Sequence, residues 1–176
     1  MTKIISSFIT IFLFSTIVAQ NAAPIILATG NQVYCPQTSL PIVTNMSITD
    51  TDDVGIAAMY IQISSGYVFG QDVLTLTGIH PTITSSWNAT EGKLTLSGIS
   101  GDPTYLQFKA AIESVVFTNS AINPSGQRIF SITVGQANYL ESTGHYYQYV
   151  PNTGISWTNA KSLAAASTYY GLQGYL

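Results

Sequence analysis

The feature that most limits how this chain can fold is a series of short segments in which apolar and polar residues alternate. In residues 57–64, the apolar side chains of Met59, Ile61 and Ile63 share one side, with Tyr60 and Gln62 on the other. A period of two is the pattern of a β-strand with one buried face. The same alternation in residues 73–77 and 128–135 predicts two further strands, and Ser47–Thr49 is a candidate first strand.

A turn signal joins two more segments of this kind. Residues 83–87 and 93–97 flank the sequence Asn88-Ala89-Thr90-Glu91-Gly92. Turn-forming residues that end in glycine favour a β-hairpin, because glycine adopts a positive φ without steric cost. We expect Leu94 and Leu96 to face the interior in this hairpin.

One helix is predicted within the series of strands. Tyr105, Phe108, Ala111, Ile112 and Val115 recur at helical spacing, after Asp102 or Thr104 as the cap. A strand over residues 114–118 follows. About seven short strands with one crossover helix predict a mostly β fold, a Greek-key β-sandwich over residues 39–138. Residues 20–38 contain Pro, Gly and Asn residues that are typical of turns and loops, so we expect an irregular segment that leads into the sandwich.

The composition excludes some functions. Only 7% of the 176 residues are charged, and the formal net charge is −3. Five scattered Lys and Arg residues form no basic patch, so we exclude nucleic acid as a partner. Uncharged strands rich in Thr and Tyr favour an extracellular β-module. The one cysteine, Cys35, excludes an internal disulfide. We expect it to be buried, and an intermolecular link is the alternative.

The N-terminal residues have the pattern of a secretory signal peptide. Lys3 precedes an apolar stretch over residues 4–18, and Ala19 is a small residue before the expected cleavage point. The alternative is an uncleaved anchor, although the stretch is short and polar for a membrane span. We therefore assign residues 1–19 to a signal peptide and expect a secreted or cell-surface protein, with no transmembrane segment after signal removal.

Residues 50–136 resemble bacterial cadherin-like repeats. The shared elements are an acidic opening, GQDVLTLTG, WNATEGKLTLSG, the helix in YLQFKAAIE and the strand in NPSGQRIFSITVG. The resemblance implies a cadherin-like or immunoglobulin-like sandwich that acts as a spacer in a surface adhesin. The layout resembles the N-termini of large secreted proteins of gliding Bacteroidetes.

Residues 145–176 resemble the opening of a C-type lectin-like domain. The run WTNAKSLA contains Trp157 and Ala160 of the pattern Trp-x-x-Ala-x-x-x-Cys, but Ala164 replaces the cysteine. We predict a helix over residues 157–166 with Ser156 as its cap and Trp157 buried. We assign residues 139–176 to the incomplete N-terminal part of this domain. The resemblance implies carbohydrate or protein binding, with ligand residues beyond Leu176.

The acidic cluster Asp50, Asp52 and Asp53 is the candidate metal site. Carboxylates on one loop supply the oxygen ligands that Ca²⁺ prefers. The spacing does not fit an EF-hand, and a solvated turn is the alternative interpretation. Asp72 or Asp102 could contribute from another loop.

No pattern predicts a catalytic site, and we expect no enzyme in this chain. His80 and His145 have no nearby nucleophile system, and nothing in the sequence brings Glu91 and Glu113 together as a carboxylate pair. The tyrosines of the C-terminal segment favour packing over sugar stacking. We expect the N-terminal fragment of an exported adhesin-like protein. A structural surface or filament component, or the non-catalytic part of a secreted enzyme, are the alternatives.

Overall fold

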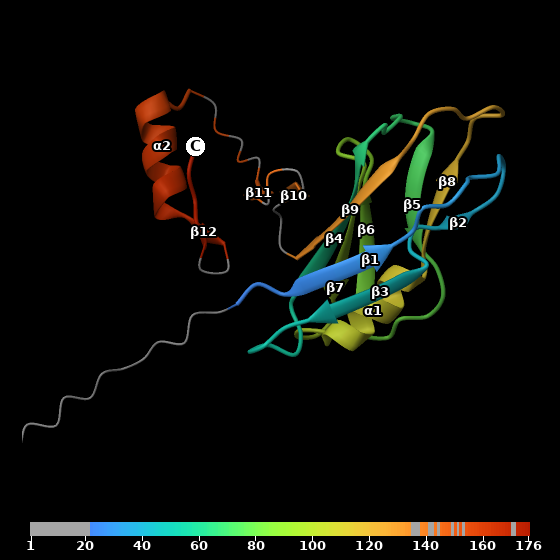
Figure 1. Ribbon diagram of the computed structural model, residues 1–176, viewed down its shortest axis with the longest axis horizontal. Helices are drawn as coiled ribbons and strands as arrows, with labels where there is room; N and C mark the ends of the chain where they lie inside the picture. The colour runs from blue at the N-terminus through green and yellow to red at the C-terminus, as the bar shows by residue number, and fades with distance from the viewer. Residues whose placement is uncertain are drawn as a thin grey trace, which may run out of the picture.

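The computed structural model describes residues 22–134, 138–140, 143, 145–148, 150, 152, 154–169 and 172–176. The predicted signal peptide lies outside the described residues. The described chain is mostly β, with several antiparallel sheets, and this arrangement is consistent with a β-sandwich (Figure 1).

The largest sheet has four strands in the order β6-β7-β4-β9. These strands are β4 (Ala58–Ser65), β6 (Ile83–Asn88), β7 (Lys93–Gly98) and β9 (Ile129–Val134), and all neighbours are antiparallel. The predicted hairpin is confirmed, since β6 pairs with β7 and Trp87 lies opposite Leu94. Met59, Ile61 and Ile63 are buried, as their alternation predicted.

The second sheet has the order β2-β8-β5, with β2 (Leu40–Pro41), β5 (Asp72–Leu76) and β8 (Val115–Asn119). Side chains from both sheets meet in one core. From the large sheet come Met59, Ile61, Leu94, Leu96 and Val134, and from the second sheet come Leu74, Val115 and Phe117. Burial of a large apolar side chain contributes about 1.5–3 kcal/mol, so this core is the main source of stability.

Helix α1 (Tyr105–Glu113) lies at one end of the sheets (Figure 1). Its predicted cap is confirmed: the Thr104 hydroxyl accepts a hydrogen bond from the backbone N–H of Gln107. The Gln107 side chain in turn accepts from the Thr104 N–H. This capping box satisfies N–H groups that the helix itself cannot pair. Phe108, Ala111 and Ile112 are buried in the shared core.

The segment predicted to be a loose lead-in is a structured part of the fold. Strand β1 (Ile25–Thr29) pairs antiparallel with β3 (Asn45–Thr49), and Leu27 lies opposite Ser47. The interpretation of residues 25–29 as irregular was therefore wrong. An antiparallel partner lies about twenty residues further along the chain and satisfies their backbone groups.

Cys35 is exposed, which corrects the prediction that it is buried. Neighbouring side chains of an extended segment point to opposite sides. Tyr34, the residue before Cys35, packs against the core, so the cysteine side chain points outward.

The C-terminal segment contains α2 (Trp157–Ala166) and four short strands. The strands form two separate hairpins: β10 (Asn138–Leu140) with β11 (His145–Tyr147), and β12 (Thr168–Tyr169) with β13 (Leu172–Gln173). The predicted helix and its cap are confirmed, since the Ser156 hydroxyl accepts a hydrogen bond from the Asn159 N–H. Burial of Trp157 was predicted wrongly. Its side chain is 61% exposed, and none of the residues of α2 is buried.

Candidate functional site

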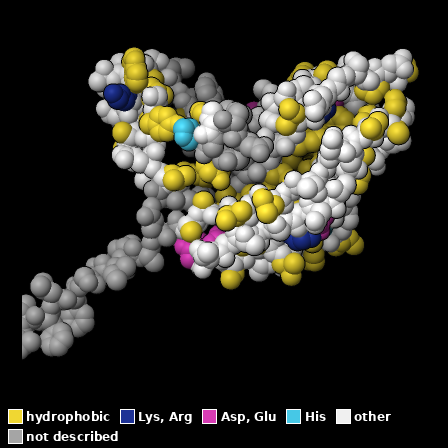
Figure 2. Space-filling model, in the orientation of Figure 1, with side chains coloured by type: hydrophobic (Ala, Val, Ile, Leu, Met, Phe, Trp, Pro, Cys, Tyr) yellow, Lys and Arg dark blue, Asp and Glu magenta, His cyan; other side chains and the backbone are white. Residues whose placement is uncertain are grey.

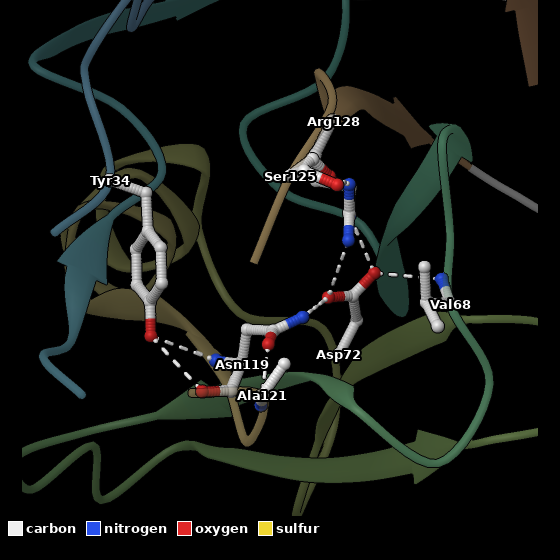
Figure 3. A network of polar contacts seen from close by, with 7 residues as sticks. All are labelled: Tyr34, Val68, Asp72, Asn119, Ala121, Ser125 and Arg128. Carbon is white, nitrogen blue, oxygen red and sulfur yellow. Dashed lines mark hydrogen bonds and ion pairs between the residues drawn. The ribbon is translucent and has the colours of Figure 1, made fainter. Parts of the chain in front are cut away.

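A buried ion pair joins the two sheets (Figure 3). Asp72 opens β5 in the second sheet, and Arg128 comes directly before β9 in the large sheet. Arg128 Nε donates to Asp72 Oδ2 across 2.7 Å, and the Asp72 side chain has no exposed surface. A charge this deep is stable only with a partner and with its remaining lone pairs satisfied.

The remaining lone pairs of Asp72 are satisfied by two further donors. The Val68 N–H donates to Oδ2 at 2.8 Å, and the Asn119 side-chain amide donates to Oδ1 (Figure 3). Arg128 Nη1 also donates to the Ser125 carbonyl at 2.9 Å. Among the described residues, no buried side-chain nitrogen or oxygen atom lacks a hydrogen-bond partner. This network therefore fastens loops and sheets together, and each of its buried side-chain polar atoms has at least one partner.

Tyr34 extends the network to the edge of β8. Its hydroxyl accepts from the Asn119 N–H at 3.0 Å and donates to the Thr38 carbonyl at 2.9 Å. The hydroxyl thus pairs with β8 just beyond the start of the two-residue strand β2, whose Leu40 lies opposite Phe117. Asp72 was predicted only as an additional metal ligand, and Tyr34, Asn119 and Arg128 were not predicted. The only signal was that one charged pair interrupts otherwise uncharged segments.

A groove opens beside this network. It has a volume of about 320 Å³ and lies between residues 30–34, residues 40–42 and the end of the sandwich formed by residues 117–130. Figure 2 shows a hollow with a hydrophobic floor in this part of the molecule. The ring of Phe117 lies 5.1 Å from that of Tyr34 and 5.6 Å from that of Phe130, measured between centroids. Aromatic rings therefore line the groove.

The structure brings the three predicted metal ligands together. One carboxylate oxygen from each of Asp50, Asp52 and Asp53 lies within 4.8 Å of the others. Two ligands of one Ca²⁺ ion are at most about 5 Å apart, because each lies about 2.5 Å from the ion. The donor set therefore fits Ca²⁺, with three of the six to eight oxygens that this ion takes. Asp72 is engaged with Arg128 and does not join the cluster.

Hydrogen bonds order this acidic loop. Asp50 Oδ1 accepts from the N–H groups of Asp52 and Asp53, and Oδ2 accepts from the Tyr105 hydroxyl at 2.8 Å. Burial raises the pKa of Asp50, but the hydrogen bonds from the Asp52 backbone and from Tyr105 outweigh it and lower that pKa to about 2. The Asp50 carboxylate is thus held ionised, and Tyr105, the first residue of α1, fixes its orientation.

The other titratable candidates do not form a reactive group. Glu91 pairs with Lys93 at 3.5 Å, and Glu113 pairs with Lys109 within α1, so each glutamate is held by its own lysine. His80 Nε2 lies 3.0 Å from the Thr77 carbonyl. His145 Nδ1 lies 2.7 Å from the hydroxyl of Tyr175, which is exposed on the C-terminal segment. Tyr149 and Tyr170 lie outside the described residues.

One tyrosine near the network has a shifted pKa. Burial, together with the negative charge of Asp72, raises the pKa of the Tyr67 hydroxyl. This hydroxyl donates to the Ala89 carbonyl and holds the turn between β6 and β7. Its role is therefore to brace a hairpin.

Comparison with known proteins gives one partial similarity. The chain is 30% identical over 141 residues to Halomucin of Haloquadratum walsbyi, an alignment that covers 74% of this chain and 2% of Halomucin. No family model matches the chain, and no solved structure matches it. The likeness is therefore to one small segment of a far longer protein. In the part of the chain that the structure describes, no helix has the length and hydropathy to cross a membrane.

Proposed function

We propose that this chain is part of an exported, adhesin-like protein of the cell surface or the secreted fraction. In this proposal residues 39–138 form a cadherin-like Greek-key sandwich that serves as a spacer. Residues 139–176 open a C-type lectin-like domain that binds carbohydrate or protein. The likeness to Bacteroidetes surface proteins belongs to the same proposal.

The buried polar network of the β-rich part is the observation that supports a role as a spacer. Three polar side chains in this network are buried or nearly so: Asp72, Arg128 and Asn119. Their hydrogen bonds to one another connect the two sheets. A module that transmits position between other domains needs such cross-links and needs no free reactive group. The place of α1 in the chain, after β7 and before β8, also supports the cadherin-like interpretation.

An extracellular setting is supported by two observations. Charged residues are few, and polar positions are filled by uncharged side chains. The name of the relative, Halomucin, contains the word mucin. The lectin-like interpretation is supported by α2 and its Ser156 cap at the positions that the resemblance implies.

Ca²⁺ at Asp50, Asp52 and Asp53 is a second part of the proposal. The 4.8 Å spread of the carboxylate oxygens and the ionised state of Asp50 support it. The ion would neutralise three like charges on one loop next to the N-terminus of α1. This would rigidify the end of the module at which the chain enters from residue 22.

The binding role is tested with the intact protein as its cells produce it. It is applied to an array of glycans and to surface proteins of cells that live with the producer. The proposal expects retention of at least one glycan or protein class, and weaker retention by Trp157→Ala, which removes an exposed aromatic ring from α2. Absence of retention on both panels would remove the lectin-like role and leave a purely structural surface component.

A further inference from the structure

We infer that the groove beside Arg128, defined by residues 30–34, 40–42 and 117–130, is a binding site for one unit of a neutral saccharide. This inference deepens the proposed function in its ligand class but places the site in the β-rich part, away from α2. The groove's volume of about 320 Å³ lies at the small end of ligand pockets, which hold small molecules from about 300 Å³ upward.

The charge of the groove selects a neutral ligand. Arg128 is the one charged side chain among the residues that line it, and Asp72 neutralises the guanidinium at 2.7 Å. An anionic sugar would therefore gain little attraction. A cationic ligand would find no free carboxylate among the residues that line the groove.

Arg128 nevertheless retains hydrogen-bonding capacity. A guanidinium has five N–H groups, and here Nε, Nη1 and Nη2 each donate one hydrogen bond, to Asp72, Ser125 and Asp72 respectively. One N–H on Nη1 and one on Nη2 remain. Their natural partners are uncharged oxygens, such as the hydroxyl and ring oxygens of a sugar.

The rim supplies amides, and the floor supplies aromatic rings. The side-chain amides of Asn31 and Gln127 line the groove, and neither makes a hydrogen bond to another described residue. An amide offers a donor and an acceptor side by side, which matches two neighbouring hydroxyl groups. Phe130 and Tyr34 are half-buried beside the buried Phe117, so apolar ring surface faces the groove. The C–H face of a sugar packs on such surface while its hydroxyls reach the rim.

A competing occupant is an extended peptide that adds to the edge of β9. Strand β9 is the last strand of its sheet, so one row of its backbone groups faces away from β4. The amide rim and the free guanidinium N–H groups favour the saccharide, because a peptide strand would use the backbone edge and leave these side chains without partners. The experiment separates the two.

The test titrates the purified chain with neutral hexoses, N-acetylhexosamines and their disaccharides, with uronic acids as the anionic comparison and an uncharged extended peptide as the competitor. Binding is followed by calorimetry and by amide chemical shifts. Asn31→Ala and Gln127→Ala remove rim hydrogen bonds without touching the ion pair. The matched control is Asn159→Ala, since Asn159 lines a separate open hollow on α2.

We expect a neutral saccharide to bind, with shift changes at residues 30–34 and 124–130. Each rim variant should weaken binding about fivefold, the equivalent of one hydrogen bond, and Asn159→Ala should not change it. Binding by no neutral saccharide, binding that the rim variants leave intact, or loss on Asn159→Ala would each overturn the inference. Shifts along β9 with the peptide alone would overturn it in favour of strand addition. Because the rim variants Asn31→Ala and Gln127→Ala leave α2 intact, failure here is separate from failure of the lectin-like role.

Discussion

Arg128 and Asp72 form the only cross-link between opposite charges that joins the two sheets within the described residues, with Nε 2.7 Å from Oδ2 and the carboxylate fully buried. The pair lies 56 positions apart in the chain. It therefore forms only when the edge of the large sheet meets the start of β5, and it ties the fold together at the end opposite α1.

Removal of one partner of this pair should strongly destabilise the protein. We expect Arg128→Met to lower the free energy of unfolding by about 3–5 kcal/mol, because a buried carboxylate is left without its counter-charge. Urea denaturation followed by circular dichroism measures the change. The matched control is Lys109→Met on α1, whose pair with Glu113 is partly exposed and should contribute about 0.5 kcal/mol or less. Equal effects of the two variants would contradict a fastening role.

The double variant Arg128→Met with Asp72→Leu should be more stable than Arg128→Met alone. The second substitution removes the uncompensated buried charge, and an apolar pair of similar volume often replaces a buried ion pair without loss. A double variant that is less stable by the sum of the single effects would show that the two side chains act independently.

Protonation of Asp50 should destabilise the fold only in strong acid. Its pKa falls from an ordinary 3.8 to about 2 in the folded protein, despite burial that raises it, because backbone N–H groups and Tyr105 donate to the charged form. A lowered folded-state pKa stabilises the protein above pH 3.8, and this contribution is lost as the pH falls toward 2. Nuclear magnetic resonance titration of the carboxyl carbon gives the value directly. Tyr105→Phe should raise it, and an unchanged pKa in that variant would contradict the assigned cause.

Calcium should stabilise the protein through the acidic loop. Binding to the folded state alone raises the melting temperature with ligand concentration. We expect a higher melting temperature in millimolar CaCl₂ than in chelator, and no difference in Asp52→Asn, which removes one of the three carboxylates and keeps the backbone N–H groups that donate to Asp50. Magnesium is the control ion. Identical melting curves with calcium and with chelator would remove the metal site.

The Thr104 cap should contribute measurably to stability. Thr104→Ala removes the oxygen that accepts from the Gln107 N–H and should cost about 1 kcal/mol. Thr104→Ser keeps the oxygen and should preserve most of the stability. If serine and alanine behave alike, the contribution of Thr104 comes from its methyl group and not from the cap.

The two parts of the chain should respond differently to truncation of large side chains. Ile61 is fully buried, and Ile61→Ala should cost about 2–5 kcal/mol. Trp157 is 61% exposed, and Trp157→Ala should change the free energy of unfolding by less than about 0.5 kcal/mol. A large effect at Trp157 would show that α2 packs on a core of its own.

Local patterns in the sequence predicted the elements that depend on near neighbours. The alternation around Ile61 gave β4, and Thr104 and Ser156 were recognised as caps because a cap is set within four residues. Strand β1 was missed because IILAT has no alternation and its partner β3 lies across a long connection. Its strand character is decided by pairing.

The polar groups around the groove could not be predicted in the same way. Asp72 lies in a Gly-Gln-Asp sequence that is typical of a surface turn, and its burial depends on Arg128 and Asn119, more than 45 positions away. The acidic loop was predicted because its three carboxylates are adjacent in sequence. The prediction that Trp157 is buried was wrong. A helical pattern shows on which side of the helix a residue lies, but it does not show whether another element covers that side.

Export of the protein is the central claim, and one measurement tests it most directly. Cells that produce the protein are fractionated, an antibody against the β-rich part locates it, and the N-terminal residue of the recovered protein is determined. The account predicts protein outside the cytoplasmic membrane that lacks residues 1–19. Recovery in the cytoplasm with Met1 still present would contradict it.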